Sequence, residues 1–306
     1  MQTLLKLLGF FITILFLIKC SDQKNKHTVN QNQISDDSLA IKIKEARSSR
    51  TDKALRYELL EQSLAEIEDI DSDSTKSSYY SKIPYAFYKL NDSIQFMNHV
   101  MKALELSKKA KDSMAIADLY WDLGNYYDDL NVSDSSYYYY NEAYQVFESQ
   151  DSISKSAKML LNMAIIQKNI KDYTSSEGTT IKALERFKLI DDNRRVYSCY
   201  NNLGLILAEL DDYERSFFYY NRALEYLEKL DQKNISSKAI SYNNIGNLLR
   251  KQGKYEEAID NYENGIELDS LFIKDPRSYA LLLDNLGYAK LQLGDTSKLP
   301  DLFIKS

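Results

Sequence analysis

The sequence predicts an all-α protein built from repeated pairs of helices, and three observations support that prediction. The 306 residues contain only 9 glycines and 3 prolines, too few for the turns of a protein made of many short strands. A small residue recurs at a nearly constant interval along most of the chain. Each interval contains two amphipathic stretches of helical length.

The N-terminal segment differs from the rest of the chain. Lys6 precedes an apolar run, residues 7–18, which is too short for a membrane-spanning helix of about 20 residues and suits a secretory signal. With Cys20 directly after it, the segment resembles a bacterial lipoprotein signal, which implies that residues 1–19 are removed and Cys20 is lipidated. Lys19 departs from that pattern, because a small residue is usual there. An uncleaved membrane anchor and a cytoplasmic chain therefore stay open as alternatives.

Residues 20–36 are predicted to form a flexible polar tether. They contain no aromatic residue and show no hydrophobic periodicity. We expect the repeat domain to occupy residues 37–306.

The repeats are defined by one position, called here the small position. Five short motifs align there in register, and weaker matches extend the frame toward the N-terminus, with steps of 38 to 42 residues. Seven repeats result, of which the last is incomplete. The small position is occupied in order by Ala46, Pro84, Gly124, Ala164, Gly204, Gly246 and Gly287.

Repeat six shows the two helices of a repeat most clearly. Residues 239–252 carry apolar side chains on one face and end at Gly253, a helix-terminating residue. Residues 255–268 follow with apolar residues at steps of three and four, the pattern of a second amphipathic helix. We name these two helices A and B.

The residues of this repeat resemble the tetratricopeptide repeat. The matching positions are Tyr242, Ile245, Gly246, Leu249, Tyr255, Ala258, Tyr262 and Gly265. The resemblance implies a right-handed superhelical solenoid of about seven antiparallel helix pairs. It also implies that the small position lets helices A and B approach closely, while a buried aromatic residue of helix B, Tyr140, Tyr220 or Tyr262, fills the seam.

The same resemblance places ligand binding on the concave face, which helix A lines. Asparagines recur there at one repeat pitch, and an asparagine row can bind the amide groups of an extended peptide. The alternative is that these asparagines bond the neighbouring helix and serve packing. The candidate groove residues are Trp121, Asp122, Asn125, Asn162, Asn201, Asn202, Asn243, Asn244, Asn247, Arg250 and Asn285.

Two further features bear on the groove. Trp121 is the single tryptophan and the best candidate for an energetically dominant contact. Helix A is acidic in repeat three, with Asp128 and Asp129 near its end, whereas Arg250 and Lys251 end helix A in repeat six. The charge difference suits a peptide with one basic segment, and a solvated helix surface is the alternative.

Composition argues against several functional classes. The net charge of −6 and the lack of a basic block argue against nucleic-acid binding. Two cysteines and two histidines supply too few groups for a zinc site or a catalytic set. Cys199 suits a small apolar residue that fills the core, and His99 suits a position at the surface or in a seam between helices. We therefore expect no enzyme, no metal and no cofactor.

Two functions remain. The first is a non-catalytic scaffold that binds a peptide or partner protein in its groove and is held at the bacterial cell envelope, facing the periplasm or exterior. The second is the sensory region of a membrane-bound signalling protein, a helix-turn-helix regulator or a histidine kinase, with its output domain beyond residue 306. The second follows from repeat seven, whose helix B begins near Lys298 and stops at Ser306.

Overall fold

The computed structural model describes residues 38–230 and 234–295, and within these ranges the chain forms helices and no strand. The all-α prediction is confirmed. The predicted signal, the tether, Cys20 and helix B of repeat seven lie outside the described residues. No helix in the described ranges combines the length and the apolar character needed to cross a membrane. Contacts between residues divide the chain into two compact units. The boundary in the sequence lies between Asp122 and Leu123.

Unit 1 holds repeats one and two. Its helices are a first segment over residues 38–46, α2 (Lys53–Glu68), α3 (Asp73–Tyr80), α4 (Ile83–Tyr88), α5 (Ser93–Ala110) and the first part of α6 (Ser113–Asp129). Helix A of repeat two is broken into α3 and α4, because Pro84 near the start of α4 has no backbone N–H and its ring crowds the preceding turn. Buried Arg56 of α2 links the first helix to α4, since its Nε donates to the carbonyl of Ala46 at 2.7 Å and its Nη2 to the carbonyl of Ala86 at 3.4 Å.

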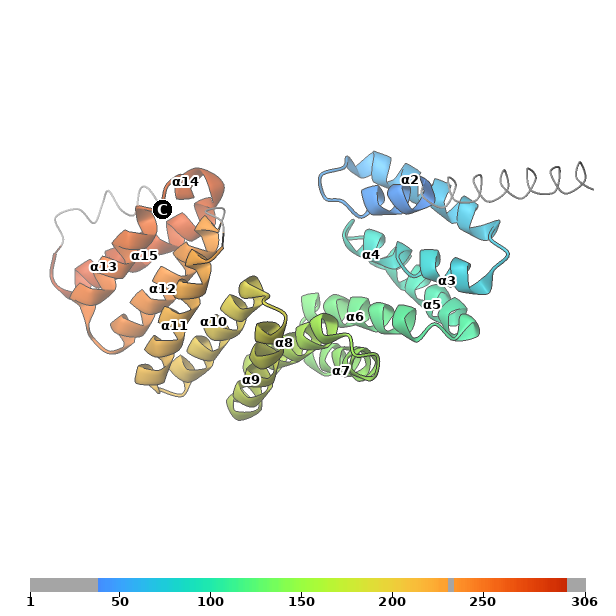
Figure 1. The fold of residues 1–306 in the computed structure, drawn as a ribbon. Helices are drawn as coiled ribbons and strands as arrows, with labels where there is room; N and C mark the ends of the chain where they lie inside the picture. The colour runs from blue at the N-terminus through green and yellow to red at the C-terminus, as the bar shows by residue number, and fades with distance from the viewer. Residues whose placement is uncertain (1–37, 231–233, 296–306) are drawn as a thin grey trace, which may run out of the picture. The chain divides into compact units, whose positions relative to one another are not determined.

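Unit 2 continues the alternation of helices A and B, which run back and forth along the chain (Figure 1). After the end of α6 come α7 (Ser133–Ser149), α8 (Ile153–Asn169), α9 (Tyr173–Leu189), α10 (Asn193–Glu209), α11 (Tyr213–Glu228), α12 (Ile235–Lys251), α13 (Tyr255–Ile266), α14 (Leu271–Lys274) and α15 (Pro276–Gln292). Helix A of repeats four to seven is thus α8, α10, α12 and α15. The short α14 is an addition that interrupts the spacing between α13 and α15.

Most of the turns between the described helices share one backbone geometry. From Asn91 to Asp211, every twentieth residue has a positive φ, and Gly253 and Gly294 take this conformation in later turns. The N–H of the next residue then donates to a carbonyl five residues back, as Asp212 does to Leu207 at 2.9 Å. This bond closes the helix end. The repeat of about 40 residues is therefore two helix-and-turn segments of equal length.

The small position acts as the sequence predicted. A methyl group at Gly204 would lie 2.5 Å from ring atoms of Tyr220, and Gly124 and Gly246 face Tyr140 and Tyr262 in the same way. Glycine is therefore required where a tyrosine ring crosses helix A. Repeat four differs in both partners, since it has Ala164 at the small position and Thr180 at the position of the tyrosine, both buried.

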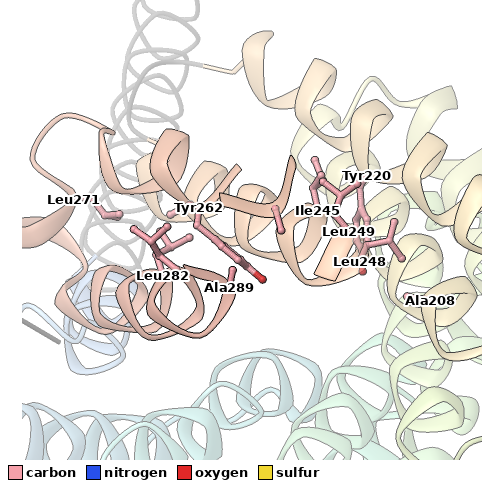
Figure 2. Packing of buried hydrophobic residues seen from close by; sticks show 12 residues of the cluster. Ala208, Tyr220, Ile245, Leu248, Leu249, Tyr262, Leu271, Leu282 and Ala289 are labelled. Atoms are coloured by element: carbon pink, nitrogen blue, oxygen red, sulfur yellow. The ribbon is translucent and has the colours of Figure 1, made fainter. Parts of the chain in front are cut away.

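The apolar core of repeats five to seven follows from this packing. Figure 2 shows Tyr220 of α11 against Leu248 and Leu249 of α12, and Tyr262 of α13 beside Leu282 of α15. Each tyrosine thus fills the seam between its own repeat and the next. The core continues from repeat to repeat as a row of similar layers.

Candidate functional site

The predicted groove residues lie on helix A of successive repeats. Trp121 and Asp122 belong to α6 at the end of unit 1 and are half-buried. Asn162 on α8 is also half-buried. The other predicted residues lie on α6, α10, α12 and α15 within unit 2, and their contacts are described next.

Two asparagine pairs link helix A of three consecutive repeats. Nδ2 of Asn244 on α12 donates to Oδ1 of Asn201 on α10 at 2.9 Å. Nδ2 of Asn285 on α15 donates to Oδ1 of Asn243 on α12 at 2.7 Å. An amide has two N–H donors and two acceptor positions on oxygen, so one bond leaves most of this capacity unused. Half-buried Asn201, Asn244 and Asn285 retain donors and acceptors at the surface of helix A.

Asn202 and Asn243 are placed differently from the prediction, because both are buried. Asn202 is only 4% exposed, and its Nδ2 donates to Oγ1 of Thr180 at 2.9 Å. Thr180 in turn donates to the carbonyl of Ser176 at 2.7 Å. The side chain of Asn202 is therefore occupied by the previous repeat and is closed to a ligand in this structure. In repeats five to seven, the asparagine two residues before the small position bonds the preceding repeat, as the packing alternative predicted. These residues are Asn202, Asn244 and Asn285.

Asn125 and Asn247 orient their amides through buried tyrosines. The hydroxyl of Tyr140 donates to Oδ1 of Asn125 at 2.9 Å, and the hydroxyl of Tyr262 donates to Oδ1 of Asn247 at 2.9 Å. The tyrosine that fills the seam thus reaches through to helix A. Because each oxygen accepts from a tyrosine, the amide nitrogen is the group left to donate to a ligand.

Arg250 lies close to Asn247 on α12. Its guanidinium carbon is 5.0 Å from the centre of the Tyr288 ring of α15, a cation–π contact. Burial raises the pKa of Tyr262, and the charge of Arg250 acts in the opposite direction, which places the guanidinium near that hydroxyl. Nε of Arg250 is buried and has no hydrogen-bond partner among the described residues. Arg250 as a whole is half-buried, so part of its side chain remains at the surface of helix A.

The charges along helix A are less separated than the sequence suggested. Burial, and next the charge of Asp129, raise the pKa of Asp128 near the end of α6. Lys251, however, pairs with Glu209 at 3.0 Å and also donates to the carbonyl of Ala208. Arg250 is left as the basic group of α12 that faces an aromatic ring and no carboxylate in the described pairs.

Cys199 and His99 both take part in packing. Cys199 is buried in α10, and burial raises the pKa of its thiol to about 12, so the thiol is protonated at neutral pH. His99 of α5 accepts or donates a hydrogen bond at 2.7 Å with the Tyr80 hydroxyl and stacks on Phe87. Within residues 38–230 and 234–295, no three histidine, cysteine or acidic side chains come together as a metal site.

Several contacts were missed from the sequence. The sequence contained a sign of the contact between Thr180 and Asn202, because Thr180 replaces the tyrosine found at the same position in three other repeats. The sequence contained no sign of the contact between Tyr288 and Arg250, since these two residues lie on helices of different repeats.

Comparison with known proteins identifies repeats in two segments of the chain. Residues 155–229 and 239–270 each match a sequence model of the tetratricopeptide repeat. The chain is similar to regulatory protein RapK of Bacillus subtilis, with 27% identity over 244 residues, which is 77% of this chain and 62% of RapK. It is also similar to response regulator aspartate phosphatase E of that organism, with 22% identity over 237 residues, 76% of this chain and 61% of the phosphatase. The chain therefore spans less than two thirds of the length of these relatives.

Solved structures with similar folds include an apo protein and two complexes. The apo form of RapI aligns with a TM-score of 0.70 and 16% identity over 89% of this chain and 74% of RapI. A Rap protein complexed with Competence and Sporulation Factor aligns with a TM-score of 0.59 and 17% identity, over 88% of this chain and 75% of the Rap chain. NprR in complex with its cognate peptide NprX aligns with a TM-score of 0.58 and 15% identity, over 88% of this chain and 75% of the NprR chain. At these identities the similarity concerns the fold.

Proposed function

Because this chain belongs to the tetratricopeptide repeat family, which residues 155–229 and 239–270 match, we propose that it is a non-catalytic regulatory scaffold that binds an extended peptide or a partner protein. The observation that carries the proposal is the row of asparagine pairs on α10, α12 and α15. It is supported by the complexes of two proteins with this fold, NprR with its cognate peptide NprX and Rap with Competence and Sporulation Factor.

The proposed binding surface is the helix A face of repeats five to seven. Asn201, Asn244 and Asn285 present the amide groups that the inter-repeat bonds leave unused. An extended peptide has one N–H and one C=O for every residue, so paired amides at repeat pitch can bind its backbone whatever its side chains. Asn247 adds a donor, and Arg250 adds a cation for a carboxylate of the peptide.

A peptide selected from a random display library against the 306-residue chain tests this surface. Asn201→Ala combined with Asn244→Ala should weaken its binding by about 1 to 3 kcal/mol, from the loss of buried hydrogen bonds. The matched control is Asn261→Ala, because Asn261 lies in the same repeat but on helix B, where its amide bonds the carbonyl of Glu257. Equal affinity of the double variant and the control would assign the asparagine pairs to packing alone.

The non-catalytic part of the proposal needs a test of its own, since one relative is named a response regulator aspartate phosphatase. We expect that adding the chain to a response regulator phosphorylated on aspartate leaves the rate of dephosphorylation unchanged. A rate that rises in proportion to the concentration of the chain would make the protein an enzyme.

The location of the scaffold is proposed from residues 1–20 alone. We propose that Cys20 carries a lipid that holds the protein at the cell envelope. Cys20→Ala should then move the protein from the membrane fraction to the soluble fraction. Retention of this variant in the membrane would favour an uncleaved apolar anchor.

The second candidate function is the sensory region of a longer signalling protein. It is favoured by two relatives, one of which is named a regulatory protein, because this chain spans 62% and 61% of their lengths. Sequencing the native gene past the Ser306 codon separates the two candidates. A reading frame that continues into an output domain would support the sensor, and a stop codon would support the scaffold.

A further inference from the structure

A basic pocket lies in unit 1, between the first helix and the start of α4. It has a volume of about 280 Å³, and three of the residues that line it are the cations Lys44, Arg47 and Lys82. Ser48 and Tyr85, which also line it, carry hydroxyl groups. No acidic residue is part of its lining, although the whole chain has a net charge of −6.

The helix spacing explains how the pocket is built. Ala40, Ile43 and Lys44 are three and four residues apart and share one face of the first helix, and Arg47 follows in the turn that ends it, where its N–H still donates to the carbonyl of Ile43. The two apolar residues form part of the wall beside the two cations. From the other side, the Tyr85 ring of α4 lies 4.7 Å from the guanidinium carbon of Arg47 and holds that group by a cation–π contact.

Several basic residues of unit 1 outside the pocket pair with carboxylates. Lys42 pairs with Glu66, Lys102 with Glu68 at 2.6 Å, and Lys109 with Asp73 at 3.0 Å. No ion pair to a carboxylate of the described residues forms at Lys44, Arg47 or Lys82.

The charges of the pocket also act on one another. Partial desolvation of its ammonium group, and next the charge of Arg47, lower the pKa of Lys82, although the residue as a whole is exposed. Asp118 and Asp112 act in the opposite direction but more weakly, and neither lines the pocket. Like charges that converge are unfavourable, and a bound anion reduces that cost.

We propose that this pocket binds a phosphate monoester, as carried by a phosphorylated side chain of a partner protein. Such a group has a charge of about −1.5 to −2 at pH 7 and three strong acceptor oxygens. The fork of donors on Arg47 and the point charges of Lys44 and Lys82 suit that geometry. A carboxylate, with one charge and two oxygens, would leave part of the positive charge uncompensated. Ala40, Ile43 and the Tyr85 ring provide apolar contact for the carbon side of the ester.

Calorimetric titration of the 306-residue chain tests the site, with N-acetyl phosphoserine amide, inorganic phosphate and acetate as probes. We expect saturable binding of the phosphoserine compound. Its affinity should be at least about tenfold lower in Arg47→Gln and in Lys82→Gln. The control is Lys108→Gln, which removes the same charge from the exposed end of α5 and should leave the affinity unchanged. Acetate should bind at least about tenfold more weakly.

Several results would overturn the proposal. They are the absence of saturable phosphoserine binding, an equal loss of affinity in Lys108→Gln, and acetate binding as tight as that of phosphoserine. Binding of inorganic phosphate alone would make the pocket a free-phosphate site. The Lys82→Gln variant guards against misfolding, because Lys82 is exposed, and circular dichroism of each variant checks the helical content. Peptide binding by α10, α12 and α15 uses none of these residues, so the two proposals fail independently.

Discussion

The packing of Gly204 against Tyr220 makes a strong prediction about a single methyl group. In Gly204→Ala the new carbon would lie 2.5 Å from Cδ1 and Cε1 of Tyr220, whereas carbon atoms in contact are about 3.5 to 4.0 Å apart. The ring must therefore move by about 1 Å or more, in a seam where Tyr220 is only 2% exposed. Overpacking of this kind costs about 1 to 3 kcal/mol.

An opposing term comes from the helix itself. Alanine in a helix interior is favoured over glycine by about 0.5 to 1 kcal/mol. We therefore expect Gly204→Ala to destabilise the protein by up to about 2 kcal/mol, measured as a lower midpoint of urea unfolding followed by circular dichroism.

Gly178→Ala is the matched control, because Gly178 lies within α9 and nothing approaches its added carbon within 4 Å. This variant should be more stable than the parent by about 0.5 to 1 kcal/mol. In a Tyr220→Thr background, which copies the natural pairing of Ala164 with Thr180, Gly204→Ala should become stabilising as well. If Gly204→Ala raises the unfolding midpoint as much as Gly178→Ala does, the close packing of the seam is refuted.

Three further predictions concern the turns, the half-buried histidine and the buried thiol. Lys171 has a φ of 66°, so Lys171→Gly should raise the urea midpoint by about 0.5 kcal/mol or more, and an unchanged midpoint would count against strain in this turn. Burial, and next the charge of Lys102, lower the pKa of His99 below 6.5, so the unfolded chain binds this proton more readily than the folded chain. Stability should therefore fall as the pH drops below about 6.5, and His99→Gln, which lacks this titration, should have a flatter profile of urea midpoint against pH. In a Cys20→Ser background Cys199 should resist a thiol reagent at pH 8 until urea unfolds the chain, and rapid labelling without urea would contradict its burial.

The sequence predicted part of the candidate site well and part of it poorly. It placed the asparagines on helix A, because helix periodicity and the repeat frame assign each residue to a face. It left open whether they bind a peptide or the next helix, and the structure shows that Asn202 and Asn243 are buried and that Asn201 and Asn244 bond each other. A shift of a few ångströms between two helices decides between these states, and no periodicity in the sequence records it.

The sequence by itself determined the family, the helix pairs and the residues that pack between them, since the tetratricopeptide resemblance is confirmed and Gly204 and Gly246 face the predicted tyrosines. These features depend on local periodicity and side-chain size, which the sequence states directly. Only the tertiary structure decided the division of the chain within α6, the stacking of Arg250 on Tyr288 and the convergence of Arg47 and Lys82 on one pocket. The repeat pattern continues across that division, and the contacts join residues on different helices, so their geometry depends on how the helices pack.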